Sequence, residues 1–123
     1  MIFERIKTGV VSHLSYFIGS GAEALVVDPR RDSQVYIELA EKNEVNIKYI
    51  FETHRNEDYV IGSIELAELT GARIFHGPWP DFRYGEALKG GEKFRVGVLE
   101  VTTLHTPGHT PGCMSYVIAD LET

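Results

Sequence analysis

Glu52-Thr53-His54-Arg55-Asn56-Glu57-Asp58-Tyr59 is the stretch of sequence that bears most directly on both the fold and the site. It follows an apolar run at residues 47–51, which predicts a strand, and it precedes a helical pattern. When a strand of an α/β protein ends in a polar loop, that loop lies at the open edge of the sheet, where such proteins build their sites. We therefore expect His54 and Asp58 to belong to a functional site.

A second stretch, His105-Thr106-Pro107-Gly108-His109-Thr110-Pro111-Gly112, lies between two further strand-like runs. Its prolines and glycines exclude a helix and favour a rigid turn. The chain therefore has two loops that contain histidine, each next to a predicted strand.

The rest of the sequence predicts a mixed sheet with helices on at least one face. Asp32 or Ser33 is a candidate cap for a helix that ends near Asn43, and Asp58 or Ser63 for a second helix at residues 64–69 that ends at Gly71. The predicted strands cover residues 2–6, 14–18, 24–27, 46–51, 72–75, 93–96, 99–104 and 114–119, with turns at 19–21 and 97 and a long surface loop at 77–91.

Length and composition predict one globular domain. The chain has 123 residues, 43% of them hydrophobic, and a formal net charge of −6, which argues against binding to nucleic acid or to an anionic membrane. No run approaches the roughly 18 apolar residues of a membrane helix, and the N-terminus lacks a signal-peptide pattern. We therefore expect a cytoplasmic protein. The single cysteine, Cys113, excludes an intrachain disulfide.

Together, the two loops resemble those of the metallo-β-lactamase fold, in which a T-H-x-H-x-D-H loop and a later T-P-G-H-T loop supply ligands to one or two metals. The chain is most similar to the branch of glyoxalase II-like hydrolases and persulfide dioxygenases, particularly to domains fused to rhodanese domains. Glu52-Thr53-His54, the loop at 105–112 and the Val-Asp-Pro-Arg-Arg-Asp stretch at 27–32 carry this similarity.

The resemblance covers essentially the whole chain but only about the amino-terminal half of the family's domain. It implies that residues 1–123 form a single partial domain of the α/β (α+β) class. The expected architecture is a metallo-β-lactamase-like mixed β-sheet with flanking helices, corresponding to one half of an αββα sandwich.

The same resemblance implies a metal held by His54 and His109. A catalytic metal needs about three protein ligands and an open position, and two histidines with one carboxylate are typical of non-haem iron. In similar persulfide dioxygenases the third ligand comes from a later Gly-Asp turn, and this sequence contains no Gly-Asp pair. Asp58 is the expected catalytic carboxylate, either as a ligand or as the acceptor that orients His54.

Two departures from the family pattern bear on which metal is bound. Asn56 and Tyr59 stand where the dizinc hydrolases have histidines, and an asparagine cannot replace imidazole as a strong ligand. A mononuclear iron site is therefore favoured, with zinc as the alternative. Arg55 would repel a cation unless it pairs with a neighbouring carboxylate or points at an anionic substrate.

Structural roles stay open for the same residues. His54 and His109 are alternatively histidines of the sheet edge with backbone partners, and Asp58 is alternatively a helix cap. For His105 we favour a hydrogen bond that stiffens its loop. Further residues are interpreted structurally: Asp28 as a strand end, His13 and His76 as surface or strand-end residues, Cys113 as a core thiol, and Trp79, Phe82 and Tyr84 as packing of the long loop.

Three hypotheses about function follow. The first is oxidation of a thiol persulfide at a mononuclear iron, as in persulfide dioxygenases, and the second is hydrolysis of a glutathione thioester by a glyoxalase II-like zinc enzyme. Both imply a small thiol-derived substrate, such as a glutathione persulfide or thioester. The third is a non-catalytic binding module with a degraded metal site.

The incomplete ligand set and the half-sandwich lead to two expectations. We expect this chain by itself to be inactive or nearly so unless a carboxylate ligand comes from elsewhere. A half-sandwich also exposes the apolar face that its other half would cover, so we expect a homo-oligomer, or a carboxy-terminal half, to cover that face.

Overall fold

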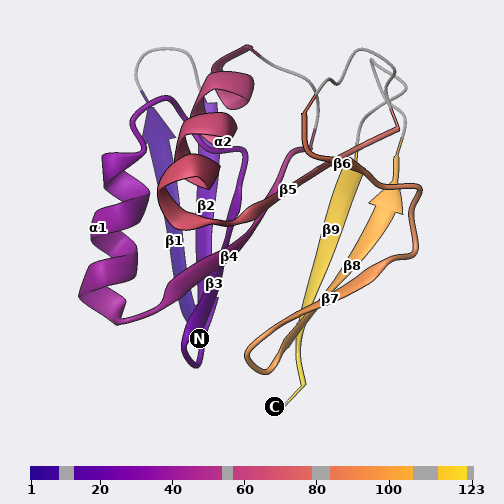
Figure 1. Ribbon diagram of the computed structural model, residues 1–123. Helices are drawn as coiled ribbons and strands as arrows, with labels where there is room; N and C mark the ends of the chain where they lie inside the picture. Colours follow the sequence, from indigo (N-terminus) through magenta and orange to yellow (C-terminus); the bar gives the residue numbers. More distant parts are fainter. Residues whose placement is uncertain (9–12, 54–56, 79–83, 107–113, 122–123) are drawn as a thin grey trace.

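The structure is a computed structural model, and it describes residues 1–8, 13–53, 57–78, 84–106 and 114–121, without the side chains of residues 7, 8, 13 and 57–61. The described elements form three layers: two helices, a six-stranded sheet and a three-stranded sheet (Figure 1). The predicted mixed sheet with flanking helices is therefore confirmed.

The larger sheet begins with an antiparallel meander and continues as a parallel sheet. α1 (Gln34–Asn43) connects the third strand to the fourth, and α2 (Glu57–Thr70) precedes the fifth. Because these strands are parallel, the carboxyl ends of the third and fourth strands lie at the same edge of the sheet. The strands, in spatial order, are β1 (Ile2–Thr8), β2 (His13–Ser20), β3 (Glu23–Val27), β4 (Asn46–Phe51), β5 (Arg73–His76) and β6 (Glu86–Ala87).

The smaller sheet is an antiparallel meander of β7 (Lys93–Val96), β8 (Leu99–His105) and β9 (Met114–Asp120). The turn between β7 and β8 contains Gly97, which has a φ of 57° and whose N–H donates to Glu23 Oε1 at 2.9 Å. A Cβ atom at this position would lie 2.3 Å from the carbonyl oxygen of Ser20. Gly97 therefore lets the tip of this hairpin pack against the β2–β3 turn.

The two faces of the larger sheet bury two separate cores, because alternate side chains of a strand point to opposite faces. On the helix side, Tyr36 of α1 and Leu66 of α2 pack against Phe17 and Val26. On the other side an aromatic cluster joins the two sheets: the Phe51 ring lies 5.4 Å from that of Phe94 and 4.8 Å from that of Tyr116. This cluster fixes the smaller sheet against the ends of β4 and β5.

The helices differ from the prediction at their starts. α2 is described from Glu57, so Asp58 and Ser63 lie inside the helix instead of capping it. The prediction was wrong because Gly62 and Ser63, which are typical of helix ends, stand inside α2 and separate residues 57–61 from the predicted helix. Ser33 does occupy the cap position of α1, but its hydroxyl donates to Glu65 Oε1 at 2.7 Å. Neither helix of the described ranges is long and apolar enough to cross a membrane.

The strands agree more closely with the prediction. All eight expected strands are present, and β6 is an additional two-residue strand inside the predicted long loop. The turn expected at 19–21 lies later, because β2 continues through Gly19 and Ser20. Gly71 ends α2 as predicted, with a φ of 76° and its N–H donating to the Ala67 carbonyl at 2.8 Å.

Gly62 tests how closely α2 approaches the chain after β3. A Cβ atom there would lie 2.4 Å from the Arg30 carbonyl oxygen and 2.7 Å from that of Pro29. We expect Gly62→Ala to lower the free energy of unfolding by about 1–3 kcal/mol through overpacking, although alanine is the better helix former by roughly 1 kcal/mol. Denaturant unfolding followed by circular dichroism measures the change.

Gly71→Ala is the matched control for this substitution. Nothing lies within 4 Å of its Cβ position, so only its positive φ resists alanine, at a cost of about 1 kcal/mol. An equal or stabilising effect of Gly62→Ala would contradict the close approach of α2.

Candidate functional site

Thr53 belongs to the first of the two stretches that the sequence singles out. It follows β4 and directly precedes His54, and its carbonyl oxygen accepts a hydrogen bond of 2.7 Å from the N–H of Met114. Met114 is the first residue of β9, and only Cys113 separates it from the second loop. One main-chain hydrogen bond therefore joins the residue before His54 to the start of β9, although Thr53 follows a strand of the larger sheet and β9 belongs to the smaller one.

Asp28 also holds Thr53 in place. Its carboxylate accepts two hydrogen bonds from Thr53, at 2.8 Å from the N–H to Oδ1 and at 2.6 Å from the hydroxyl to Oδ2. The N–H of Asp28 in turn donates to the Phe51 carbonyl oxygen at 2.9 Å. Asp28 has a φ of 51°, which aspartate tolerates better than most residues. The interpretation of Asp28 as a structural residue at a strand end agrees with these contacts.

Glu52, which precedes Thr53, is fully buried and is held from two further elements. The hydroxyl of Tyr84 donates to Oε1 of Glu52 at 2.6 Å, and the hydroxyl of Tyr116 donates to its main-chain carbonyl oxygen at the same distance. Its N–H donates to Phe75 at 2.9 Å. The backbone that leads into His54 is therefore held by hydrogen bonds from both sheets and from the segment after residue 83.

Burial decides the ionisation of these groups. It raises the pKa of Asp28 to about 7, against the hydrogen bonds from Thr53 that favour the carboxylate, and the charge of Glu52 adds to the rise. Burial, together with the nearby carboxylates, also raises the pKa of Tyr116 well above its ordinary value. Tyr116 therefore remains a hydrogen-bond donor at neutral pH.

The predicted ligands His54 and His109 lie outside the described residues. Other residues considered in the sequence also lie outside them: Arg55, Asn56, Trp79, Phe82 and Cys113. Asp58 lies in the first turn of α2, which follows the loop of His54, but its side chain is not described. Within the described ranges, no group of three or more His, Cys, Asp or Glu side chains is placed to hold a metal ion.

The other histidines and Tyr84 have structural surroundings. His76 ends β5 and is buried, with its ring nitrogens 2.8 Å from the Gly77 carbonyl oxygen and 2.6 Å from that of Tyr84. His13 and His105 likewise lie at strand ends. Tyr84 packs its ring 5.6 Å from that of His76 and reaches Glu52, so the packing role predicted for it is confirmed.

Sequence reasoning missed the roles of Glu52 and Tyr116. Tyr116 lies at an inward position of β9, and a buried tyrosine hydroxyl needs a partner. That signal was present in the sequence, but the partner is a main-chain carbonyl of the other sheet, which no local pattern identifies.

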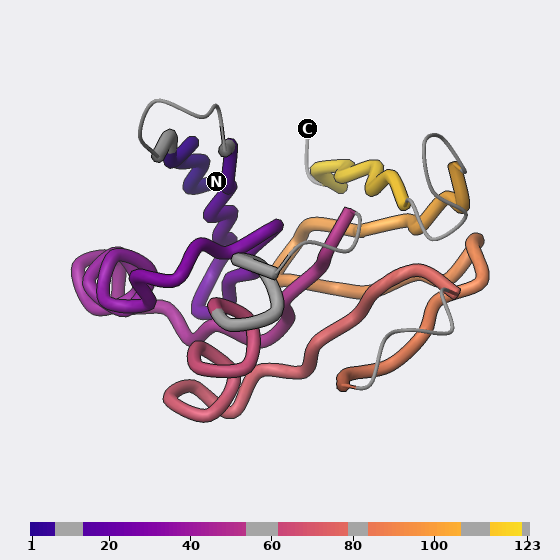
Figure 2. Tube along the Cα trace, turned by 90° about the horizontal axis from the view of Figure 1, so that it is seen from above, coloured from indigo at the N-terminus to yellow at the C-terminus, as the bar shows by residue number. Residues whose placement is uncertain are grey.

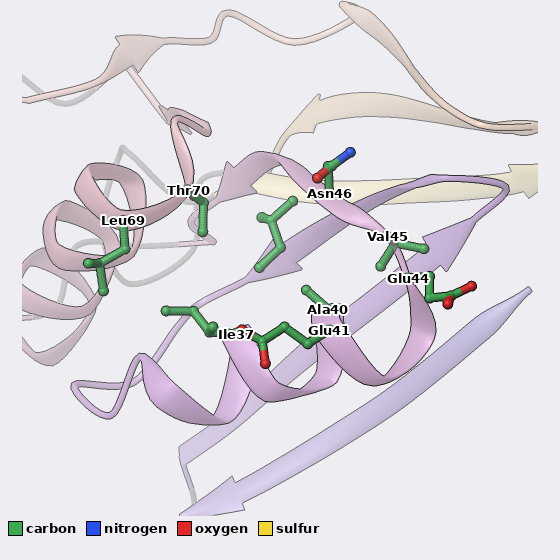
Figure 3. Close-up of a pocket in the computed structure, with 9 residues that line it drawn as sticks. Ile37, Ala40, Glu41, Glu44, Val45, Asn46, Leu69 and Thr70 are labelled. Atoms are coloured by element: carbon green, nitrogen blue, oxygen red, sulfur yellow. The ribbon is translucent and has the colours of Figure 1, made fainter.

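A separate pocket of about 410 Å³ lies between the carboxyl-terminal ends of α1 and α2 (Figure 3). Its lining includes Ile37 and Glu41 of α1, Leu69 of α2, and Asn46 at the start of β4. Thr53 follows the opposite end of β4, so this pocket does not belong to the site.

The chain matches the model of the metallo-beta-lactamase superfamily over residues 8–122. The protein therefore belongs to the metallo-beta-lactamase superfamily, and membership implies metal ions at its site. This confirms the family that the two loops predicted.

The chain is similar in sequence to several hydroxyacylglutathione hydrolases. A hydroxyacylglutathione hydrolase of Anaeromyxobacter dehalogenans is 31% identical over 114 residues, which are 91% of this chain and 44% of that protein. A cytoplasmic hydroxyacylglutathione hydrolase of Arabidopsis thaliana is 33% identical over 106 residues, 84% of this chain and 41% of that protein. The chain thus spans less than half the length of the curated relatives that it matches.

Two solved structures have the same fold as this chain. ETHE1 from Myxococcus xanthus has a TM-score of 0.85 at 27% identity, covering 96% of this chain and 54% of the other. A metallo-beta-lactamase from Staphylococcus aureus subsp. aureus COL has a TM-score of 0.86 at 30% identity, covering 98% of this chain and 39% of the other.

The raised pKa of Asp28 predicts a dependence of stability on pH. The folded state holds this proton more tightly than the unfolded state, so the contribution is fully present below pH 3.8 and is lost as the pH rises through about 7. Each pKa unit corresponds to roughly 1.4 kcal/mol. We expect Asp28→Asn to flatten the decline in the free energy of unfolding between pH 4 and pH 7, measured by urea unfolding.

Asp28→Ala separates the titration from the contacts. Asparagine keeps an acceptor for the Thr53 N–H and tolerates the positive φ, whereas alanine does neither. We expect Asp28→Ala to lower stability at every pH by about 2 kcal/mol or more. A wild-type pH profile that Asp28→Asn leaves unchanged would contradict the assignment.

Tyr116→Phe tests the hydroxyl that joins β9 to Glu52. The substitution keeps the ring contact with Phe51 and removes one hydrogen bond to a buried carbonyl. We expect a loss of about 1–3 kcal/mol in the free energy of unfolding. Tyr16→Phe is the control, because it removes a hydroxyl from a partly buried tyrosine of β2 outside this network, and an equal loss there would contradict the role of Tyr116.

Proposed function

We propose that the two loops form a metal site that acts on the sulfur of a small thiol-derived substrate. His54 and His109 hold the metal in this proposal, and Asp58 is a ligand or the acceptor that orients His54. The observation that carries it is the 2.7 Å hydrogen bond between Thr53, which directly precedes His54, and Met114, which follows the second loop after Cys113. The imidazole donors fit both iron and zinc.

The contribution of this chain's described residues is positioning. The backbone before His54 accepts from Met114 and Tyr116 and donates to Asp28, so its conformation is fixed before a metal binds. Such fixed surroundings lower the reorganisation needed on binding. Phe51, the last residue of β4, and Phe75 of β5 are buried, so the sheet next to Thr53 is closed to water.

Of the possible chemistries, we favour oxidation of a thiol persulfide, such as glutathione persulfide, at a single iron. Asn56 and Tyr59 support this choice, because they replace the histidines that a second zinc would need. Bound iron would supply coordination of dioxygen and of the substrate sulfur at one centre. In this proposal Arg55 meets the anionic part of the substrate.

Hydrolysis of a glutathione thioester is the second candidate. It is supported by relatives of 30–35% identity that are named hydroxyacylglutathione hydrolase. Zinc would lower the pKa of a bound water in that case. The same two histidines would hold it, so metal identity separates the two candidates.

We further propose that the chain corresponds to the amino-terminal half of such a domain, of the type fused to rhodanese domains. The chain spans 33–46% of the length of the matched relatives, which supports this interpretation. The third ligand is then a carboxylate from polypeptide outside these 123 residues. A non-catalytic module with a degraded site is the remaining alternative.

Metal content tests the proposal directly. We expect protein purified without chelators to contain about one iron per chain. His54→Ala and His109→Ala should each lose the metal, because a single remaining imidazole does not supply enough protein ligands to hold it. His105→Ala is the control and keeps the metal. Elemental analysis measures all four proteins.

The outcome also separates the candidates. If the metal is iron, oxygen uptake is then measured with glutathione persulfide as substrate. If the metal is zinc, and the protein releases a carboxylic acid from a glutathione thioester without oxygen uptake, the second candidate replaces the first. Protein without metal, or metal retained in both histidine variants, contradicts a metal site formed by these 123 residues. Absence of metal then leaves the binding module or a ligand from the missing half.

A further inference from the structure

The side chain of Glu52 is held as firmly as its main chain. Its N–H donates to the carbonyl oxygen of Phe75, and its carbonyl oxygen accepts from the hydroxyl of Tyr116. Its side-chain Oε1 accepts from the hydroxyl of Tyr84 at 2.6 Å, a length typical of a hydrogen bond to a carboxylate, which is stronger than one between neutral groups. Tyr84 therefore anchors a fully buried acidic side chain two residues before His54.

Tyr84 is itself fixed in position. The ring of His76 lies 5.6 Å from that of Tyr84, and its Nε2 atom lies 2.6 Å from the Tyr84 carbonyl oxygen. The next residue, Gly85, has a φ of 68°, and a Cβ atom there would lie 2.7 Å from the carbonyl oxygen of Ile74 in β5. Figure 2 shows β6, which follows these residues, beside β5. The Tyr84 hydroxyl therefore reaches Glu52 from a segment packed against the neighbouring strand.

These contacts determine how the chain enters His54. The N–H and hydroxyl of Thr53 are bonded to Asp28, and its carbonyl oxygen is bonded to Met114. Because the carbonyl of Thr53 and the N–H of His54 belong to one planar peptide group, the positions of residues 52 and 53 set the direction in which the backbone reaches His54.

Loss of the Tyr84 hydroxyl would disturb this geometry. A buried carboxylate that loses a hydrogen-bond donor is destabilised until it moves toward water or toward another donor. Glu52 is joined to Thr53 by the peptide bond, so such a movement acts on the backbone directly before His54.

We propose that Tyr84 is a positioning residue for the metal ligand His54 and acts through the side chain of Glu52. Tyr84 has this role only if His54 binds a metal, as in the function proposed above. Tyr84 is not a ligand in this proposal. The segment after residue 83 then influences how tightly the metal is bound, because it carries the hydroxyl that holds Glu52.

Tyr84→Phe tests the role of the hydroxyl. The substitution keeps the ring beside His76 and removes the donor to Glu52. We expect the affinity for Zn²⁺ and for Co²⁺ to fall by about tenfold or more, as is typical when a group that orients a metal ligand is lost. Titration calorimetry of the metal-free chain measures the affinity. The visible absorption of bound Co²⁺ reports the ligand geometry, and we expect its bands to shift.

Tyr36→Phe is the matched control. It also removes a buried tyrosine hydroxyl that joins distant elements, because this hydroxyl donates to Ser15 Oγ and accepts from the N–H of Arg30, both at 2.8 Å. We expect Tyr36→Phe to lower stability and to leave the metal affinity and the Co²⁺ spectrum unchanged. An equal fall in affinity in both variants overturns the proposal, because affinity then follows overall stability.

A double-mutant cycle tests the route through Glu52. Glu52→Gln keeps an oxygen that can accept from Tyr84 and removes the buried charge. We expect Tyr84→Phe to lower the metal affinity by a smaller factor in the Glu52→Gln background than in the wild type, because the two side chains are coupled. The same factor in both backgrounds overturns the route through Glu52.

The metal titrations also separate this role of Tyr84 from the proposed function. Metal binding that weakens in Tyr84→Phe, without reaction of either sulfur substrate, supports the positioning by Tyr84 and overturns the proposed function. Metal binding that is as tight in Tyr84→Phe as in the wild type overturns the positioning alone. A wild-type chain that takes up neither ion contradicts a metal site formed by these 123 residues and overturns the positioning with it.

Discussion

The hydrogen bonds from Thr53 to Asp28 are the constraint on which the site depends. They hold the chain at the end of β4 against the chain at the end of β3, and both strands end at the same edge because the sheet is parallel there. The same residue accepts from Met114, so the smaller sheet is tied to the larger one at this point. Among the described residues, Thr53 is therefore the point at which the ends of β3 and β4 and the start of β9 meet.

This arrangement carries an electrostatic cost. Asp28 and Glu52 are both buried, and a buried carboxylate loses hydration that hydrogen bonds only partly replace. The raised pKa of Asp28 expresses that loss, since a proton relieves it. The site therefore does not maximise stability. What it gains is a backbone with a defined conformation next to a histidine, which is the property that a metal ligand needs.

A feature of the fold or of the site could be predicted from the sequence where residues close to it in the chain determine it. β3 and β4 are apolar runs ended by polar residues, so their positions followed from the sequence, and the family followed from the residues of the two loops. The start of α2 did not, because Gly62 and Ser63, which are typical of helix ends, stand inside the helix and separate its first residues from the predicted helical stretch. Glu52 looked like one polar residue of a loop, yet it is fully buried and bonded to Tyr84 and Tyr116. Those contacts span 32 and 64 residues, and only the packing of the two sheets brings them together.

The aromatic cluster explains how distant segments can build so exact an arrangement of hydrogen bonds. Phe51 stacks on Phe75 at 5.5 Å within one sheet and meets Phe94 and Tyr116 of the other. Each ring buries a large apolar area and has few rotamers, so the distance between the sheets is narrowly defined. The hydroxyl of Tyr116 belongs to the same side chain that packs on Phe51. Packing and polar contact are therefore coupled in one residue, and a change that separates the sheets also releases the backbone before His54.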